Sequence, residues 1–249
     1  MELKEFFENN PHVALAFSGG ADSAYLLYAA SRHAKSLRAY YVKSAFQPQF
    51  ELEDAKRLSE QLGVEMTILP LNLLEDSEIT ANTSDRCYIC KQKIFSTILE
   101  AAQKDGFTLL IDGTNASDEA EKRPGMKALQ ELSIASPLRL CGIGKDEIRR
   151  RSKEAGLFTW DKPAYSCLAT RIPQGEVITK EKLEKTERAE AYLAALGFSD
   201  FRLRLLGTSA KLQLPASQIE TALRKRDAIL KELKKEYSAV LLDLEARDE

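Results

Sequence analysis

Several residue types are scarce in this sequence of 249 residues, which has only four cysteines, two histidines and one tryptophan. No apolar run approaches the length of a membrane-spanning helix, and the acidic, charged N-terminal segment has no features of a secretory signal peptide. We therefore expect a cytoplasmic chain. In that reducing compartment, thiols serve metal binding or chemistry more often than disulfides.

The sequence also lacks an excess of charge of either sign. Its formal net charge is -2, so no global positive field would draw the chain to nucleic acid or to an anionic membrane, and we expect neither as a partner. There is no internal repeat and no low-complexity segment. The apolar fraction of 44% and the charged fraction of 30% are ordinary for a globular protein, and the length allows two modest domains.

The most informative stretch is residues 13–27, VALAFSGGADSAYLL. Its first five residues have the length of a buried strand, and a helical pattern begins directly after the SGG turn. The glycines allow a tight turn with no Cβ in the way of a ligand, while the amides and dipole of the helix start favour an anion. The hydroxyls of Ser18 and Ser23 add hydrogen-bond donors, and the carboxylate of Asp22 could hold a water on Mg²⁺. The predicted anion site comprises Ser18, Gly19, Gly20, Asp22 and Ser23.

This loop differs from two common nucleotide-binding motifs. It lacks the Gly-Lys-Ser/Thr of a Walker A loop and the Gly-x-Gly-x-x-Gly of a dinucleotide fold. The pattern Ser-Gly-Gly-x-Asp-Ser instead resembles the PP-loop of the ATP pyrophosphatase superfamily, which implies ATP as the ligand. The alternative is a glycine turn between strand and helix that binds nothing.

Strand and helix patterns alternate through residues 1–160, which predicts an α/β domain with a parallel, right-handed, doubly wound sheet. Ligands of such sheets bind at the carboxyl ends of the strands. Gly113 and Thr114 end the fourth strand, and we expect them beside the loop as further nucleotide-binding residues. The polar residues 72–86 are predicted to form a loop over the active site. The predicted strands are residues 13–17, 37–42, 65–71, 108–112 and 136–140.

Residues 161–249 are predicted to form a second, smaller α+β domain. A proline-rich connection around residues 160–175 leads into patterns in the order helix, strand, strand, helix, strand. The basic run at residues 224–235 is interpreted as a solvated helix face, with a nucleic-acid-binding stripe as the alternative. The predicted elements are residues 180–196, 201–206, 210–214, 216–235 and 238–244.

Cys87 and Cys90 stand three residues apart at the start of a predicted helix. The helix N-terminus and the flanking basic residues favour thiolates. A Cys-x-x-Cys pair can be a metal site, a redox dithiol or a coincidence. A redox dithiol normally follows the first strand of its fold, and this pair does not. Cys167 is the third candidate thiol, and Cys141 is interpreted as structural.

Three thiolates can hold a [4Fe–4S] cluster through three of its irons and leave the fourth iron open. Structural zinc usually takes four protein ligands, so the three candidate thiols alone would leave zinc one ligand short. The two histidines have no ligand-like spacing to complete such a site.

Seven segments of the chain together resemble the LarE family of ATP-dependent sulfur transferases. These proteins adenylate the carboxylates of pyridinium-3,5-biscarboxylic acid mononucleotide and convert them to thiocarboxylates, on the way to the nickel-pincer nucleotide. The resemblance implies ATP with Mg²⁺ as cofactors, a small pyridinium mononucleotide as substrate, and a homo-oligomer, possibly a hexamer as in the family. The segments are residues 18–23, 86–91, 112–118, 123–125, 160–164, 166–173 and 201–204.

The resemblance also implies roles for particular residues. Cys167, Asp22 and Arg171 would be catalytic, with Arg171 as an anion contact near Cys167. The second domain, residues 161–249, would serve substrate binding, sulfur transfer and oligomerisation. Arg202 and Arg204 are two apart in a strand, so both project from one face, where paired guanidiniums suit a phosphate or carboxylate. Two solvent-facing arginines are the alternative. A further predicted substrate-binding residue is Glu190.

Members of this family differ in their sulfur source. Some give up the sulfur of a single cysteine and act once, and in this sequence that cysteine would be Cys167. Others carry two more cysteines and hold a [4Fe–4S] cluster. Because Cys87 and Cys90 are present, the resemblance favours a cluster on the three thiols, with sacrificial donation as the alternative.

The chain departs from the family pattern at two positions. Gln213 stands where the family usually has Glu, and Thr170 where it often has Ser, which weakens a metal or substrate role at residue 213. Two other functions stay open: a cluster-dependent tRNA thiolase, and a non-catalytic module that binds a nucleotide or metal. The near-neutral charge and the absence of an evident RNA-binding module count against the first.

Overall fold

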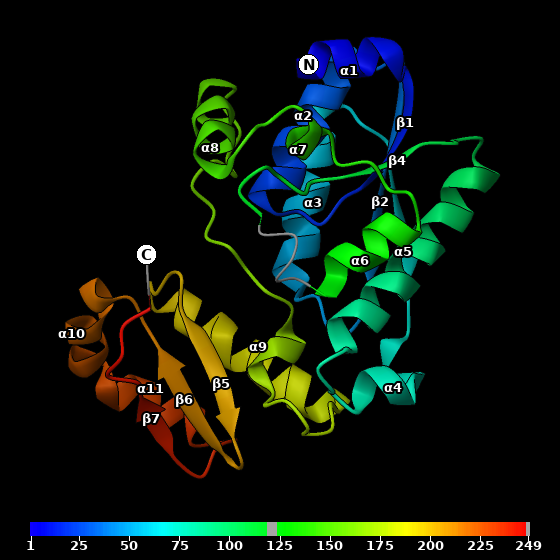
Figure 1. Ribbon diagram of the computed structural model, residues 1–249. Helices are drawn as coiled ribbons and strands as arrows, with labels where there is room; N and C mark the ends of the chain where they lie inside the picture. The colour runs from blue at the N-terminus through cyan, green and yellow to red at the C-terminus, as the bar shows by residue number, and fades with distance from the viewer. Residues whose placement is uncertain (119–123, 248–249) are drawn as a thin grey trace. The chain divides into compact units, whose positions relative to one another are not determined.

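The computed structural model describes residues 1–118 and 124–247 and divides into two compact units (Figure 1). Unit 1 consists of Met1–Leu73 and Asp85–Lys162, and unit 2 consists of Leu74–Ser84 and Pro163–Glu249. The units differ from the predicted domains at residues 74–84, which the sequence pattern placed in the first domain. The roles assigned to the two domains stay predictions.

Unit 1 is built on a four-stranded parallel sheet in the order β3-β2-β1-β4. Each strand is a short apolar run followed by polar or glycine residues, which is typical of strands buried on both faces. The carboxyl ends of β1 and β4 are neighbours, because Ala16 pairs with Asp112. The strands are β1 (His12–Ala16), β2 (Ser36–Lys43), β3 (Met66–Pro70) and β4 (Leu110–Asp112).

Helices cover both faces of this sheet. Val13 and Leu15 of β1 belong to one buried cluster, whereas Ala14 belongs to another, because successive side chains of a strand point to opposite faces. Figure 1 shows α2 and α3 on one side of the strands and α5 and α6 on the other. The predicted doubly wound parallel α/β sheet is therefore confirmed. The helices of the first cluster are α1 (Leu3–Asn9), α2 (Ala21–His33), α3 (Gln49–Leu62) and α8 (Lys145–Glu154), and those of the second are α5 (Arg86–Lys104) and α6 (Pro124–Glu131).

Two elements predicted for the first domain are wrong. Residues 136–140 form the short helix α7 (Pro137–Leu140) and not a fifth strand; only a single bridge joins Ala135 to Ile111. Proline explains the difference, since it has no amide for a sheet ladder but suits the first turn of a helix. Residues 72–86 are not purely a loop, because they contain η1 (Leu73–Glu75) and α4 (Ser77–Thr80).

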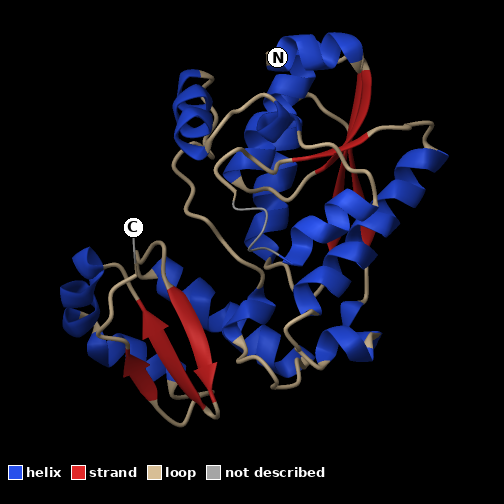
Figure 2. Cartoon of the chain, viewed as in Figure 1, coloured by secondary structure: helices blue, strands red, loops and turns tan. Residues whose placement is uncertain are grey.

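Unit 2 has its own core around a three-stranded sheet in the order β5-β6-β7, which Figure 2 shows in red. β5 and β6 form an antiparallel hairpin, and β7 pairs with β6 in parallel. The predicted helix 216–235 is two helices that meet at Lys225. The elements are η3 (Leu168–Arg171), α9 (Lys180–Ala195), β5 (Arg202–Leu206), β6 (Ser209–Gln213), α10 (Ala216–Arg224), α11 (Arg226–Leu233) and β7 (Val240–Leu242).

Asn82 fixes residues 74–84 within unit 2. Its buried side-chain amide donates to the carbonyls of Pro173 (2.7 Å) and Ile172 (3.3 Å), and its own carbonyl accepts from the amide of Gly175 (2.9 Å). Its φ of 55° is left-handed, a conformation that asparagine tolerates better than most residues. The chain therefore enters α5, which carries Cys87, directly from a segment held in unit 2.

The part of the chain that the structure describes contains no helix with the length and apolar character that crossing a membrane requires.

We expect substitution of Asn82 to destabilise the fold in two separable steps. Asn82→Gly keeps the left-handed backbone but removes the buried hydrogen bonds, which should lower the free energy of unfolding by about 1–3 kcal/mol. Asn82→Ala should lose roughly 1 kcal/mol more, because alanine is strained at positive φ. Urea denaturation measures both values. Equal stability of wild type and Asn82→Gly would contradict the assigned hydrogen bonds.

Candidate functional site

The predicted PP-loop links the end of β1 to the start of α2, whose N-cap is Gly20. Ser23 Oγ donates to the Gly20 carbonyl at 3.1 Å and lies 3.0 Å from Ser18 Oγ. Gly19 has a left-handed φ of 77°, and a Cβ there would lie 3.0 Å from the backbone oxygen of Glu51 in α3. The conformation of the loop therefore requires glycine at residue 19, and α3 packs closely against it.

The end of β4 touches this loop through its backbone. A Cβ on Gly113 would lie 2.8 Å from the backbone nitrogen of Ser23, a distance that only glycine permits. The structure thus brings Gly113 and Thr114 to the PP-loop. The Thr114 hydroxyl donates to Asp112, as does Ser136 Oγ at 2.6 Å. Burial raises the pKa of Asp112, and these two hydrogen bonds oppose that rise.

Asp22 lies in the first turn of α2 with a partly buried carboxylate. The side-chain Nδ2 of Asn115 donates to Asp22 Oδ2 at 3.1 Å, and its backbone N–H donates to Asp118 Oδ2 at 3.1 Å. Burial, followed by the negative charge of Asp118, raises the pKa of Asp22, although the Asn115 hydrogen bond opposes the rise. A carboxylate in this state gains from a nearby cation. The positive charges of Lys145 and Arg149 also oppose the rise, and a carboxylate oxygen is the kind of ligand that Mg²⁺ takes.

Lys162 also contacts the PP-loop. No role was predicted for it, and it was named only as part of the 160–164 segment. Its Nζ donates to the Gly19 carbonyl at 3.1 Å and forms an ion pair with Asp54 Oδ2 of α3 at 2.7 Å. The Lys162 side chain is only 14% exposed. The contact joins residues far apart in sequence, so spacing alone could not predict it.

The three candidate metal-binding thiols lie in different units. Cys87 and Cys90 occupy the first turns of α5 in unit 1, where the guanidinium of Arg86 donates to Cys87 Sγ at 3.3 Å. Cys167 is the N-cap of η3 in unit 2. None of the three belongs to a disulfide and none is fully buried, so as donors they suit a soft metal or a cluster. Within residues 1–118 and 124–247, no three His, Cys, Asp or Glu side chains gather closely enough to hold a metal ion.

Two other predicted features can be placed briefly. Cys141 directly follows α7 and is partly buried, and burial raises the pKa of its thiol, in keeping with an unreactive cysteine. Arg123, the first residue of the 123–125 segment, lies outside the described residues.

In unit 2, Glu190 of α9 binds Arg171 in a buried ion pair. Arg171 is 1% exposed and donates to Glu190 through Nε (2.8 Å) and Nη2 (3.2 Å). Glu190 also accepts from the Tyr165 hydroxyl (2.5 Å) and the Leu203 amide (3.0 Å). Four donors thus occupy the Glu190 carboxylate, which gives it a supporting role around Arg171. Its predicted contact with a substrate stays a prediction.

Arg202 and Arg204 lie on β5 beside this pair. Burial, and then the positive charges of Arg171 and Arg247, lower the pKa of Arg202 to about 10 and also lower the pKa of Arg204. Arg202 donates to the carbonyls of Phe201 and Ala164. Because these arginines repel one another at a partly dry site, an anion bound there would be stabilised. We call Arg171, Arg202, Arg204 and Arg247 the arginine cluster.

Tyr165 and Arg247 belong to this region but were not predicted from the sequence. The centroid of the Tyr165 ring lies 4.6 Å from the guanidinium of Arg171 and 5.5 Å from that of Arg202. Arg247 pairs with Asp200 at 3.1 Å. Tyr165 adjoins a quoted segment and could have been considered, whereas nothing in the sequence near Arg247 marks it.

The two departures from the family pattern also contact the cluster. Thr170 keeps the hydroxyl of the usual serine: its Oγ1 accepts from Arg171 Nη1 and donates to the Cys167 carbonyl, both at 2.8 Å. Gln213 Oε1 accepts from Arg204 Nε at 2.6 Å, and its amide donates to Asp243 at 2.8 Å. The glutamine therefore connects Arg204 to a carboxylate on a neighbouring strand end, although it carries no charge itself.

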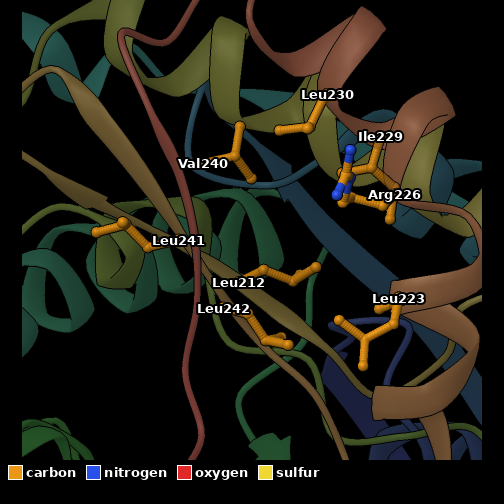
Figure 3. Close-up of a pocket in the computed structure, with 9 residues that line it drawn as sticks. Leu212, Leu223, Arg226, Ile229, Leu230, Val240, Leu241 and Leu242 are labelled. Carbon is orange, nitrogen blue, oxygen red and sulfur yellow. The ribbon is translucent and has the colours of Figure 1, made fainter.

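Unit 2 also has an apolar pocket, lined by the sheet and by α10 and α11 (Figure 3). Arg226 is its one charged lining residue, and none of the predicted site residues lines it. An apolar lining with a single guanidinium offers no nucleophile and no acid–base group. The candidate site residues therefore fall into two groups, the PP-loop region within unit 1 and the arginine cluster with Cys167 within unit 2.

Comparison with known proteins adds family relationships. Residues 12–105 match the family described as queuosine biosynthesis protein QueC. The chain is 37% identical over 222 residues to an uncharacterized protein of Synechocystis sp. (88% of this chain, 82% of the relative). It is 32% identical over 235 residues to the pyridinium-3,5-bisthiocarboxylic acid mononucleotide synthase of Lactiplantibacillus plantarum (93% and 85%). A 7-cyano-7-deazaguanine synthase of Wolinella succinogenes is 27% identical over 156 residues (55% and 65%).

We expect Glu190→Gln to destabilise the protein strongly, because it leaves Arg171 buried without a counter-charge. The loss should be about 3–5 kcal/mol in the free energy of unfolding. The matched control is Glu184→Gln on the same helix, which breaks only an exposed pair with Lys180 and should cost less than about 1 kcal/mol. Guanidinium denaturation measures both. Similar losses for the two variants would contradict the central place of Glu190 in unit 2.

Proposed function

The chain belongs to the LarE family, that of the pyridinium-3,5-bisthiocarboxylic acid mononucleotide synthases, and from this premise we propose that it converts the carboxylates of pyridinium-3,5-biscarboxylic acid mononucleotide to thiocarboxylates. It is an ATP-dependent sulfur transferase with a PP-loop domain. The observation that carries the proposal is the extent of the match, which covers 93% of this chain and 85% of the relative. The product would serve nickel-pincer nucleotide biosynthesis.

The first half-reaction would take place at the PP-loop. A carboxylate oxygen of the substrate attacks the α-phosphorus of ATP, and the bond from that phosphorus to the pyrophosphate oxygen breaks, so that the electron pair leaves with pyrophosphate. The start of α2 and the hydroxyls of Ser18 and Ser23 would hold the phosphates, with Gly113 and Thr114 beside them. Mg²⁺ would bind at Asp22 and offset the charge that develops on pyrophosphate.

The arginine cluster would bind the substrate in unit 2. Burial, and then the positive charges of Arg171 and Arg247, lower the pKa values of Arg202 and Arg204, and the phosphate or a carboxylate of the pyridinium mononucleotide would supply a counter-charge. Arg171 donates through Nη1 to the Ser166 carbonyl at 3.1 Å, and Ser166 directly precedes Cys167. Arg171 would therefore also fix the backbone that carries the sulfur-bearing residue.

The sulfur would reach the acyl adenylate through Cys87, Cys90 and Cys167. The three thiols suit a [4Fe–4S] cluster, which when bound would supply an open iron for a sulfide. In the alternative, the Cys167 thiolate attacks the acyl carbon and AMP leaves. Loss of the Cys167 Cα proton then breaks the Cβ–S bond, which gives the thiocarboxylate and dehydroalanine. We favour the cluster, because sacrificial donation has no use for Cys87 and Cys90. A homo-oligomer remains the expectation from the family.

Asp22→Asn should abolish adenylation while the chain stays folded. With ATP, Mg²⁺ and the pyridinium substrate, we expect pyrophosphate release to fall at least about 100-fold, as is common when a group that stabilises the leaving charge is lost. The control is Asp146→Asn in the first turn of α8, an exposed residue for which we expect wild-type rates. Unchanged release by Asp22→Asn would exclude the assigned role.

The sulfur source can be tested by anaerobic purification with iron and sulfide analysis. We expect about four irons per chain, as a [4Fe–4S] cluster requires. Iron and repeated turnover should be lost in Cys87→Ala and Cys90→Ala but kept in the control Cys141→Ala. Dehydroalanine at residue 167 after turnover, detected by mass spectrometry, together with full product yield from Cys87→Ala, would establish sacrificial donation instead.

A further inference from the structure

Lys162 binds the backbone of the PP-loop at Gly19. It is the last residue of unit 1, and its ammonium lies between the Gly19 carbonyl (3.1 Å) and Asp54 Oδ2 of α3 (2.7 Å). The Phe50 ring covers it at 5.5 Å. The backbone oxygen of Glu51, which is also in α3, lies 3.0 Å from where a Cβ on Gly19 would be. Gly19 is therefore contacted both by α3 and by the Lys162 ammonium.

This contact bears on the direction of one amide. In a trans peptide, the carbonyl of one residue and the N–H of the next point to opposite sides. The Gly19 carbonyl points to Lys162, so the Gly20 N–H points away from it. The partner of that N–H is Ser18 Oγ, at the long distance of 3.4 Å. The Gly20 amide is thus only weakly engaged and is available to an anion in front of the loop.

Two successive glycines make this peptide easy to rotate. Glycine populates positive and negative φ about equally, so Gly19 and Gly20 do not fix the orientation of the peptide between them. A bond to the Gly19 carbonyl does fix it, and the ammonium of Lys162 supplies a charge-assisted one. Asp54 in turn keeps the ammonium in place, because their ion pair is largely shielded from water.

We propose that Lys162 is a positioning residue of the PP-loop, which holds the Gly19 carbonyl so that the Gly20 amide faces the β- and γ-phosphates of ATP. The proposal rests on ATP binding at this loop and adds a residue to that site. Lys162 acts through the loop backbone and does not touch the nucleotide. Asp54 takes part in the same positioning, because its ion pair with Lys162 prevents the ammonium from turning toward the phosphates.

The role of Asp54 separates this proposal from a direct phosphate contact. If Lys162 touched the phosphates itself, Asp54→Asn would release the ammonium and tighten the binding of pyrophosphate. If Lys162 acts through the Gly19 carbonyl, Asp54→Asn loosens the lysine and weakens that binding. The two roles therefore predict effects of opposite sign from one substitution.

The test measures binding of Mg-ATP, inorganic pyrophosphate with Mg²⁺, and AMP to the full chain by calorimetry. We expect Lys162→Met to weaken the binding of ATP and pyrophosphate about 10-fold, the size of one hydrogen bond to a charged group, and to leave AMP binding unchanged. Lys162→Arg should restore binding to within about threefold, since it keeps a charged donor. In turnover, the KM for ATP should rise more than kcat falls.

The matched control is Lys153→Met, whose ammonium lies 4.5 Å from the Trp160 ring and away from the loop, and it should bind all three ligands normally. Equal losses for AMP and pyrophosphate, or tighter pyrophosphate binding by Asp54→Asn, would overturn the proposal. Should Lys162→Met fail to fold, Lys162→Arg and Asp54→Asn still decide it. Wild type that binds pyrophosphate but forms no thiocarboxylate would refute the proposed substrate and leave the role of Lys162 intact.

Discussion

The nucleotide half of the site depends on one close backbone contact, between Gly113 at the end of β4 and Ser23 at the start of α2. Any side chain at residue 113 would collide with the Ser23 backbone. Because β4 pairs with β1, the chain that follows Gly113 is delivered to the PP-loop. Asn115 can then reach Asp22, and its neighbour Asp118 contributes to the raised pKa of Asp22. A parallel sheet and one glycine thus assemble a site from two segments about 90 residues apart in sequence.

Unit 2 is organised by a different interaction, the buried pair of Arg171 and Glu190. A buried ion pair is stable only when further hydrogen bonds satisfy its charged atoms, and Tyr165 and the Leu203 amide supply them here. One carboxylate therefore ties η3, α9 and β5 together next to Cys167. Burial of Arg202 and Arg204, and then the positive charges of Arg171 and Arg247, lower the pKa values of both. The same arrangement places Arg202 and Arg204 where a bound anion would offset their positive charges.

Local patterns allowed the strand, turn and helix of residues 13–27 to be predicted, because glycine spacing and apolar runs act over a few residues. The doubly wound sheet followed from their alternation. The strand predicted at residues 136–140 failed, because its apolar pattern was shared with a proline-started helix. Lys162, Asn115 and Arg247 reach their partners only in the folded chain. Cys87, Cys90 and Cys167 could be recognised as chemically competent thiols, but local pattern does not show that the first two belong to unit 1 and the third to unit 2.

Lys162 is the last residue of unit 1, and the chain that follows it leads to Cys167 in unit 2. Its ammonium is held on the Gly19 carbonyl within unit 1, and two residues later the Ala164 carbonyl accepts from Arg202 within unit 2. Between them stands Pro163, whose ring restricts φ. The side chain that binds the PP-loop backbone and the carbonyl bound by the arginine cluster therefore lie two positions apart in the chain, and Cys167 follows three residues after Ala164.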